Sequence, residues 1–229
     1  MPYFDFSYII VAVIIMVVGG IASANVRRAY NKYSKVGNAQ GITGARAARE
    51  ILDAHGLQNV KIERVSGELS DHYDPRTNVV RLSSGVYDSA SIAAVGIAAH
   101  ECGHAVQHAT GYFPNKLRTA LVPVTNFCSS ISWFVIILGL FLPYQYSWVA
   151  YLGIALYATA ALFSLVTLPV ELNASQRAVA VVSGQLGFSN DEVSGVKDVL
   201  KAAAMTYVAA LFSAILQLLR IIFLVGRRR

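Results

Sequence analysis

Long apolar stretches alternate with polar segments along the chain. Four apolar stretches cover residues 8–24, 120–142, 148–168 and 202–225, the last of them interrupted by Arg220. A helix of about 20 residues crosses the hydrocarbon core of a bilayer, so each stretch is long enough to span it. The pattern predicts a mainly α, multipass integral protein of the cell membrane with about four transmembrane helices.

The largest polar segment, residues 38–109, mixes helix and strand signals. The elements expected in it are a helix over 45–54, strands over 60–65 and 78–83, and a helix over 89–108. Thr43 and Asp88 stand where the N-caps of the two helices are expected, because their side chains can accept hydrogen bonds from a first turn. We therefore expect a small α+β insert of two or three strands.

Two more helix starts follow the third apolar stretch. Pro169 suits the first turn of a new helix, which would place Glu171 near its beginning. Ser189 and Glu192 have the spacing of a capping box, in which each side chain accepts a hydrogen bond from the other residue's backbone N–H. This pair predicts the start of the last long helix.

Charge and composition agree with a membrane protein, since 55% of the residues are hydrophobic and only 14% are charged. Of the 19 Lys and Arg, 12 lie between residues 25 and 119, three lie between 169 and 201, and none lies in 143–147. Basic residues favour the cytoplasmic side, so both polar segments are predicted there, against the anionic headgroups of the lipid bilayer. The pattern of a nucleic-acid module is missing, and no nucleic-acid partner is expected.

The basic C-terminal end, residues 227–229, disagrees with this topology. A fourth complete crossing would place these arginines outside the cell. Either the last helix stops short of a full crossing or the tail departs from the charge rule.

Residues 100–104 read His-Glu-Cys-Gly-His, the form that hydrolytic zinc sites take on a helix. Histidines four residues apart lie on one face of an α-helix, about 6 Å from each other, so His100 and His104 can bind one zinc ion. Glu101 lies beside them and can act as the general base. One Zn²⁺ per chain is therefore expected.

A catalytic zinc site needs a third protein ligand. His108 lies about 12 Å along the helix axis from His100, too far for the same ion. The metzincin pattern fails too, because Gln107 and Thr110 occupy the positions of its glycine and third histidine. Glu171 is the candidate, because two apolar spans joined by a short turn return it to the membrane face of His104.

An interpretation of Glu171 without a metal also remains open: a solvated carboxylate at a helix N-terminus, where the helix dipole stabilises it. If Glu171 is a ligand, Ser175 lies one helical turn later on the same face and can hydrogen-bond a ligand histidine. The two cysteines, Cys102 and Cys128, predict no disulfide, and Cys102 is expected to pack away from the histidines.

Three groups of residues resemble the YugP-like neutral zinc metallopeptidases, a family of multipass bacterial membrane proteins. They are His100–His104 preceded by Ser91-Ile92-Ala93-Ala94, Asp74-Pro75 with Arg81-Leu82-Ser83, and Glu171-Leu172-Asn173-Ala174-Ser175. The likeness covers nearly the whole chain. More distantly, the chain is similar to the HtpX-like membrane proteases, whose third zinc ligand comes from a Glu-x-x-Ala-Asp segment.

The resemblance implies His100, His104 and Glu171 as ligands and Glu101 as the base. The chain has Ser175 where the HtpX-like pattern has aspartate, which changes the group that would orient a ligand histidine. Histidines are also missing after His108, so a donor to the oxyanion of the transition state has to come from elsewhere. The candidates are His72, Arg177 and Tyr207.

Two further features have open interpretations. In such proteases an edge strand beside the metal helix can pair with an extended substrate, so the strand at 78–83 is either a substrate edge or an ordinary core strand. Thr125, Ser129 and Ser132 form a polar stripe along the second span, which indicates helix packing or a substrate path.

The expected organisation has four parts. They are an N-terminal transmembrane helix with a juxtamembrane linker over 1–37, a zincin-like catalytic segment over 38–119, a transmembrane hairpin over 120–168, and a third-ligand helix with a C-terminal apolar helix over 169–229.

The hypothesis from sequence is a membrane-embedded zinc metalloendopeptidase of the gluzincin type. Glu101 would assist the attack of a zinc-bound water on a peptide bond of a peptide or membrane-protein substrate. One alternative is a site-2-type intramembrane protease, for which residues 91–106 are apolar enough, although an Asn-Pro-Asp-Gly or Leu-Asp-Gly segment is missing. Another is a noncatalytic, zinc-dependent membrane scaffold.

Overall fold

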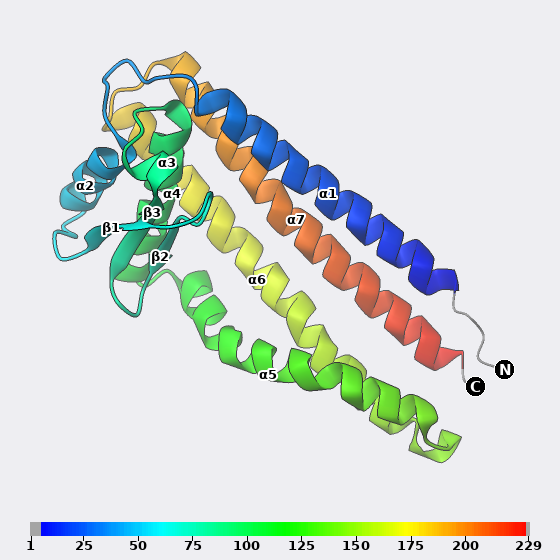
Figure 1. The fold of residues 1–229 in the computed structure, drawn as a ribbon. Helices are drawn as coiled ribbons and strands as arrows, with labels where there is room; N and C mark the ends of the chain where they lie inside the picture. The colour runs from blue at the N-terminus through cyan, green and yellow to red at the C-terminus, as the bar shows by residue number, and fades with distance from the viewer. Residues whose placement is uncertain (1–5, 228–229) are drawn as a thin grey trace. The chain divides into compact units, whose positions relative to one another are not determined.

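A computed structural model describes residues 6–227, so the first five residues and the last two arginines of the basic C-terminal end lie outside the described part. Figure 1 traces the elements. The helices are α1 (Phe6–Tyr33), α2 (Gly44–Ala54), α3 (Ser84–Tyr87), α4 (Ile92–Ala109), α5 (Phe113–Phe141), α6 (Trp148–Gly184) and α7 (Asn190–Gly226), with a 3₁₀ turn at Tyr144–Tyr146. The strands are β1 (Lys61–Val65), β2 (His72–Asp74) and β3 (Val79–Ser83).

The chain folds as two compact units, each assembled from segments distant in sequence. The apolar unit consists of Met1–Ile21, Lys116–Pro169 and Thr206–Arg229, and the polar unit consists of Ala22–Asn115 and Val170–Met205. Among the described residues, four helices are long and apolar enough to cross a membrane. The prediction of a mainly α membrane protein with about four spanning helices and a small insert of two or three strands is confirmed, and the insert has three strands.

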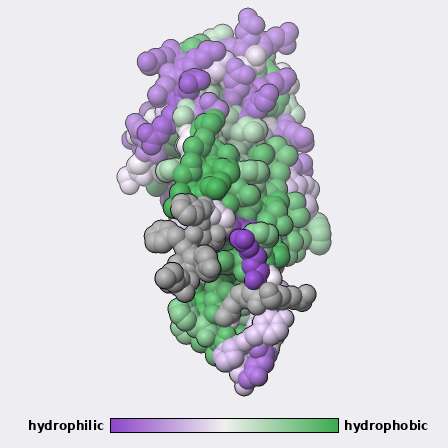
Figure 2. All heavy atoms as spheres, turned by 90° about the vertical axis from the view of Figure 1, so that its right-hand side faces the viewer, coloured by the Kyte–Doolittle hydropathy of each residue, from purple (hydrophilic) through white to green (hydrophobic). Residues whose placement is uncertain are grey.

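In the apolar unit, α5 and the first part of α6 form a close helical hairpin. A Cβ atom added at Gly139 would collide with the backbone of Ala150, and one added at Gly153 would lie 2.7 Å from the backbone nitrogen of Ile136. The outward side chains of this unit include exposed phenylalanines such as Phe134, and Figure 2 shows many hydrophobic side chains on the face in view. Such a surface suits lipid as its solvent.

In the polar unit, the sheet has the order β1–β3–β2. β3 pairs with β1 in parallel and with β2 antiparallel, so β3 is the central strand. Of the two interpretations left open for residues 78–83, the structure favours the ordinary core strand, because both edges of β3 are already paired. Val79, Val80 and Leu82 are buried, as a central strand requires.

Two predictions about helix starts, at Asp88 and at Pro169, are wrong. Asp88 does not cap α4; it ends α3, a short helix that sequence analysis did not foresee, and its carboxylate pairs with Arg64. Ser91 is the N-cap of α4 instead, and its hydroxyl accepts a hydrogen bond from the backbone N–H of Ala94. α4 therefore begins at Ile92, three residues later than the predicted helix start at residue 89.

Pro169 starts no new helix but lies inside α6, which runs unbroken across it. Immediately after Pro169, one face of α6 is buried at every fourth residue, through Val170, Ala174, Ala178 and Val182. Burial of that face in the polar unit favours continuing the helix over the local preference of proline for a first turn. Glu171 is therefore a mid-helix residue.

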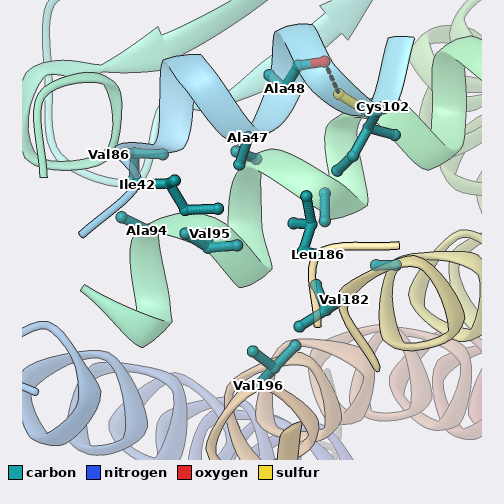
Figure 3. Packing of buried hydrophobic residues seen from close by; sticks show 14 of the residues in the cluster. Ile42, Ala47, Ala48, Val86, Ala94, Val95, Cys102, Val182, Leu186 and Val196 are labelled. Carbon is teal, nitrogen blue, oxygen red and sulfur yellow. Dashed lines mark hydrogen bonds between the residues drawn. The ribbon is translucent and has the colours of Figure 1, made fainter. Parts of the chain in front are cut away.

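The core of the polar unit joins α2, β3, α4, the end of α6 and the start of α7. Figure 3 shows members of this core, among them the small side chains of Ala47 and Ala94 and the larger ones of Val182, Leu186 and Val196. The small residues let α2 and α4 approach each other closely. This packing buries much of α4, the helix that carries the His-Glu-Cys-Gly-His motif.

Two predicted caps are present. The hydroxyl of Thr43 accepts from the N–H of Arg46 at the start of α2. Before α7, the N–H of Ser189 donates to Glu192 Oε2 over 2.8 Å, and the N–H of Glu192 donates to Ser189 Oγ over 3.4 Å, which completes the capping box. The other oxygen of Glu192 accepts from the N–H of Ala39, so this cap also holds the loop before α2.

Candidate metal centre

Three side chains converge between α4 and α6 within the polar unit. His100 Nε2 lies 3.2 Å from His104 Nε2, as their spacing on one face of α4 predicts. Glu171 Oε2, from α6, lies 3.3 Å from His100 Nε2 and 3.4 Å from His104 Nε2. The structure therefore brings together the three predicted ligand residues, which come from segments about 70 residues apart.

Gly103 explains how α6 comes so close to the histidines. A Cβ atom added at Gly103 would lie 2.8 Å from the carbonyl oxygen of Ala174 and 3.2 Å from its Cα. Real side chains do not tolerate such contacts with backbone, so only glycine permits this approach. The glycine of the motif, together with Ala174, sets the distance between the two helices at the level of Glu171.

The three atoms fit one zinc ion. Zinc bonds to imidazole nitrogen and carboxylate oxygen are about 2.0–2.2 Å long, so neighbouring ligand atoms of a tetrahedral ion lie about 3.3–3.6 Å apart. The observed separations of 3.2, 3.3 and 3.4 Å are close to this range. Within the described residues, this is the one group of at least three potential metal-binding side chains whose donor atoms gather so closely.

The electrostatics of the site favour a cation. Glu171 is only 2% exposed, and its carboxylate faces the two imidazole rings. Burial lowers the pKa of His104, but the hydrogen bond with Glu171 and the charges of Glu101 and Glu171 raise it more, so the net pKa lies above its ordinary value. Positive charge at the His104 ring is therefore stabilised by the two carboxylates.

Each histidine also has a polar neighbour at its other ring nitrogen. Ser175 Oγ lies 3.2 Å from His100 Nδ1, the contact that sequence analysis anticipated. Gln107 Oε1 lies 3.1 Å from His104 Nδ1. Sequence analysis used Gln107 only to exclude a metzincin, although its position three residues after His104 on the same helical face was a usable signal.

Glu101 faces the edge strand β2. The backbone N–H of Tyr73 donates to Glu101 Oε2 over 3.0 Å, and the Glu101 side chain is largely buried. This contact orients the carboxylate from β2, a strand whose position sequence analysis did not predict. Because Tyr73 contributes a backbone group, its residue type gave no signal of the contact.

Asp71 fastens the beginning of β2 to the end of β3, where its carboxylate accepts hydrogen bonds from the N–H and the hydroxyl of Ser83. Burial raises the pKa of Asp71, the hydrogen bonds from Ser83 oppose this, and the nearby charge of Glu101 adds to the rise. Asp71 thus belongs to the surroundings of Glu101, and sequence analysis missed it.

The three candidates for an oxyanion donor have different surroundings. His72 is exposed, with its Nδ1 atom 2.8 Å from the carbonyl oxygen of Ser70. Arg177 donates from Nε to Asn173 Oδ1 over 2.8 Å. Tyr207 belongs to the apolar unit and not to the polar unit that holds the histidines.

Two residues near the motif stay outside the group of ligand atoms. The thiol of Cys102 is fully buried against Ala48, with its sulfur 3.6 Å from the carbonyl oxygen (Figure 3), and burial raises its pKa well above the ordinary value. A thiol that stays protonated is a poor metal ligand, which agrees with the packing role expected of it. His108 contacts the Tyr73 hydroxyl over 3.1 Å.

Comparison with known proteins extends this picture. A relative from Bacillus subtilis (strain 168), named "Putative membrane protease YugP", is 46% identical over 208 residues, which cover 90% of this chain and 92% of the relative. Solved structures give no match. The family model described as "Putative neutral zinc metallopeptidase" matches residues 8–226. The chain therefore belongs to the family described as "Putative neutral zinc metallopeptidase".

Proposed function

We propose that this protein is a membrane-embedded zinc endopeptidase of the gluzincin type, with one zinc ion per chain held by His100, His104 and Glu171. The observation that carries the proposal is the convergence of these three donor atoms at separations of 3.2–3.4 Å, beside a carboxylate that follows the first histidine. The family of the chain supports zinc as the metal and peptides as the substrate class.

Zinc bound there supplies Lewis acidity, which polarises a substrate carbonyl and lowers the pKa of water. Glu101 is the proton carrier in this proposal. Its carboxylate accepts a proton from the attacking water, and the resulting carboxylic acid then donates that proton to the amine of the departing peptide. The Tyr73 N–H donates to Glu101 Oε2 and so holds the orientation of this carboxylate.

Of the two edge strands of the sheet, β2 is the one that contacts Glu101. β2 lies at the end of the order β1–β3–β2 and reaches Glu101 through Tyr73. An extended peptide that adds to β2 would place its backbone next to the general base, with affinity from main-chain hydrogen bonds and little side-chain preference. Such a mode suits unfolded or membrane-associated chains as substrates.

The distribution of charge and of apolar helices supports a site on the cytoplasmic side of the membrane. The lysines and arginines concentrate in the polar unit's sequence segments, which favours a cytoplasmic location for the site. The four apolar helices provide the anchoring in lipid. A site-2-type protease would require an aspartate as third ligand, and the group found among the described residues has Glu171 in that place.

Cleavage and zinc content, measured on the same purified proteins, test this proposal. We expect Glu101→Gln to keep its zinc and to cleave an unfolded protein substrate at least about 100-fold more slowly, because general base catalysis contributes about 10²–10⁴-fold. Glu171→Gln should lose zinc. Glu50→Gln, on the surface of α2, serves as the control and should do neither.

Equal cleavage by Glu101→Gln and the parent would overturn the mechanism. Zinc binding without any Glu101-dependent cleavage would identify the noncatalytic scaffold instead. Full zinc affinity in Glu171→Gln would remove Glu171 from the ligand set.

A further inference from the structure

Gln107 makes a set of contacts that the proposed chemistry does not use. Its side chain is fully buried between α4 and α6. The amide nitrogen donates to the carbonyl oxygen of Val170 over 2.8 Å and to Asn173 Oδ1 over 3.1 Å, and the amide oxygen lies 3.1 Å from His104 Nδ1. All the polar atoms of this amide thus have partners, although the residue touches none of the ligand nitrogens.

The orientation of this amide follows from its neighbours. A backbone carbonyl such as that of Val170 can only accept hydrogen bonds, so the group facing it must be the amide NH₂. The second neighbour agrees, because the Arg177 guanidinium, which can only donate, already donates to Asn173 Oδ1 over 2.8 Å. Arg177 thereby identifies that atom of Asn173 as oxygen, and Gln107 must donate to it.

The same reasoning extends to His104. With the NH₂ group of Gln107 turned towards α6, its oxygen faces His104 Nδ1, and an oxygen there requires a proton on the ring nitrogen. A neutral imidazole with its proton on Nδ1 has a free electron pair on Nε2. Nε2 is the atom that faces His100 and Glu171.

We infer that Gln107 is a positioning residue that fixes His104 in the Nδ1–H tautomer. Three residues of α6 set the orientation of the Gln107 amide: Val170 and Asn173 accept its hydrogen bonds, and Arg177 holds Asn173. This inference rests on the metal site of the proposed function. The amide couples the two halves of that site, because the helix that supplies Glu171 also supplies the carbonyl that orients Gln107. Outer groups of this kind typically change metal affinity by about 10–100-fold.

His100 provides an internal contrast. Its outer neighbour is the Ser175 hydroxyl, which can either donate or accept, so that contact does not select a tautomer. In this protein the defined tautomer at one histidine comes from an amide instead of the carboxylate that commonly fills the role. Arg177, a candidate oxyanion donor from sequence, contributes here by anchoring Asn173.

Two substitutions of Gln107 separate tautomer control from a merely structural role. Gln107→Leu removes the acceptor for His104 and both donor hydrogens. Gln107→Glu also removes the amide NH₂, but in either protonation state it retains an oxygen that can accept from His104 Nδ1. A structural role in joining α4 to α6 would make both variants fail alike, whereas tautomer control would spare the Glu variant.

The measurements are the zinc dissociation constant, from chelator competition in detergent, and the ring-nitrogen NMR signals of ¹⁵N-histidine in metal-free protein. We expect Gln107→Leu to bind zinc about 10–100-fold more weakly and to lose the Nδ1–H signature of His104. Gln107→Glu should stay within about threefold of the parent and keep that signature. Asn173→Leu, which retains the Val170 anchor, should give a smaller loss than Gln107→Leu.

Equal zinc affinity in the Leu variant and the parent would overturn the inference, as would an equal loss in the Leu and Glu variants. An Nε2–H tautomer of His104 in the metal-free parent would overturn it too. These readouts do not involve peptide cleavage. A parent that binds zinc but cleaves nothing would therefore refute the proposed function while leaving the role of Gln107 intact.

Discussion

The contact between Gly103 on α4 and Ala174 on α6 leads to the sharpest prediction. In Gly103→Ala, the new Cβ would lie 2.8 Å from the Ala174 oxygen, whereas ordinary contacts begin at 3.4 Å. The helices must therefore separate by about 0.6 Å at this level. Overpacking of this size in a well-packed interior costs about 1–3 kcal/mol.

This separation would change the distance between the candidate ligands, because Gly103 precedes His104 and Ala174 lies three residues after Glu171. Metal sites tolerate deviations of only about 0.2 Å in ligand distances. If the metal-free variant relaxes by opening the two helices, zinc binding must close them again and bear that cost. A cost of 1–3 kcal/mol corresponds to about 5–150-fold weaker zinc binding.

Zinc competition with a coloured chelator is the assay, and Gly184→Ala is the matched control. Gly184 lies at the end of α6, and an added Cβ there meets nothing within 4 Å. Thermal unfolding is less informative, because alanine favours a helix over glycine by about 1 kcal/mol and offsets part of the strain. A folded Gly103→Ala protein whose zinc affinity lies within twofold of the parent would refute the reasoning.

Two further predictions concern single hydroxyl groups. Ser175→Ala should weaken zinc binding by about tenfold in the same titration, because His100 loses its contact at Nδ1, and an unchanged affinity would exclude an orienting role for Ser175. Ser91→Ala should lower the free energy of unfolding by about 1 kcal/mol through loss of the α4 N-cap, measured by denaturant titration. Asp88→Ala should have a smaller effect, and the reverse order would return the cap to Asp88.

Local signals accounted for the helices and for much of the metal centre. Apolar stretches of spanning length predicted the four long helices, because bilayer thickness acts on each stretch separately. The motif placed two histidines on one face of α4, because helical geometry alone brings residues four apart together. Capping of α7 by Ser189 and Glu192 was equally local.

Interactions between residues distant in sequence explain where the predictions from sequence failed. Pro169 was expected to start a helix, but the buried face of α6 that follows it favours continuation. Residues 79–83 could be recognised as a strand from their β-branched and apolar side chains, yet their central place in the sheet depends on both neighbours. Backbone donors such as the Tyr73 N–H leave no trace in the sequence, because every residue except proline has one.

The sequence by itself indicated the class of the protein and two of the three residues of its candidate metal centre, because membrane helices and paired histidines leave short-range patterns. It also singled out Glu171, by counting crossings. Tertiary structure alone decided that β2 is the edge strand beside Glu101, that Gly103 sets the approach of α6, and that the Gln107 amide lies against His104. These depend on where two distant helices meet, and packing of their buried faces, not local spacing, determines that meeting.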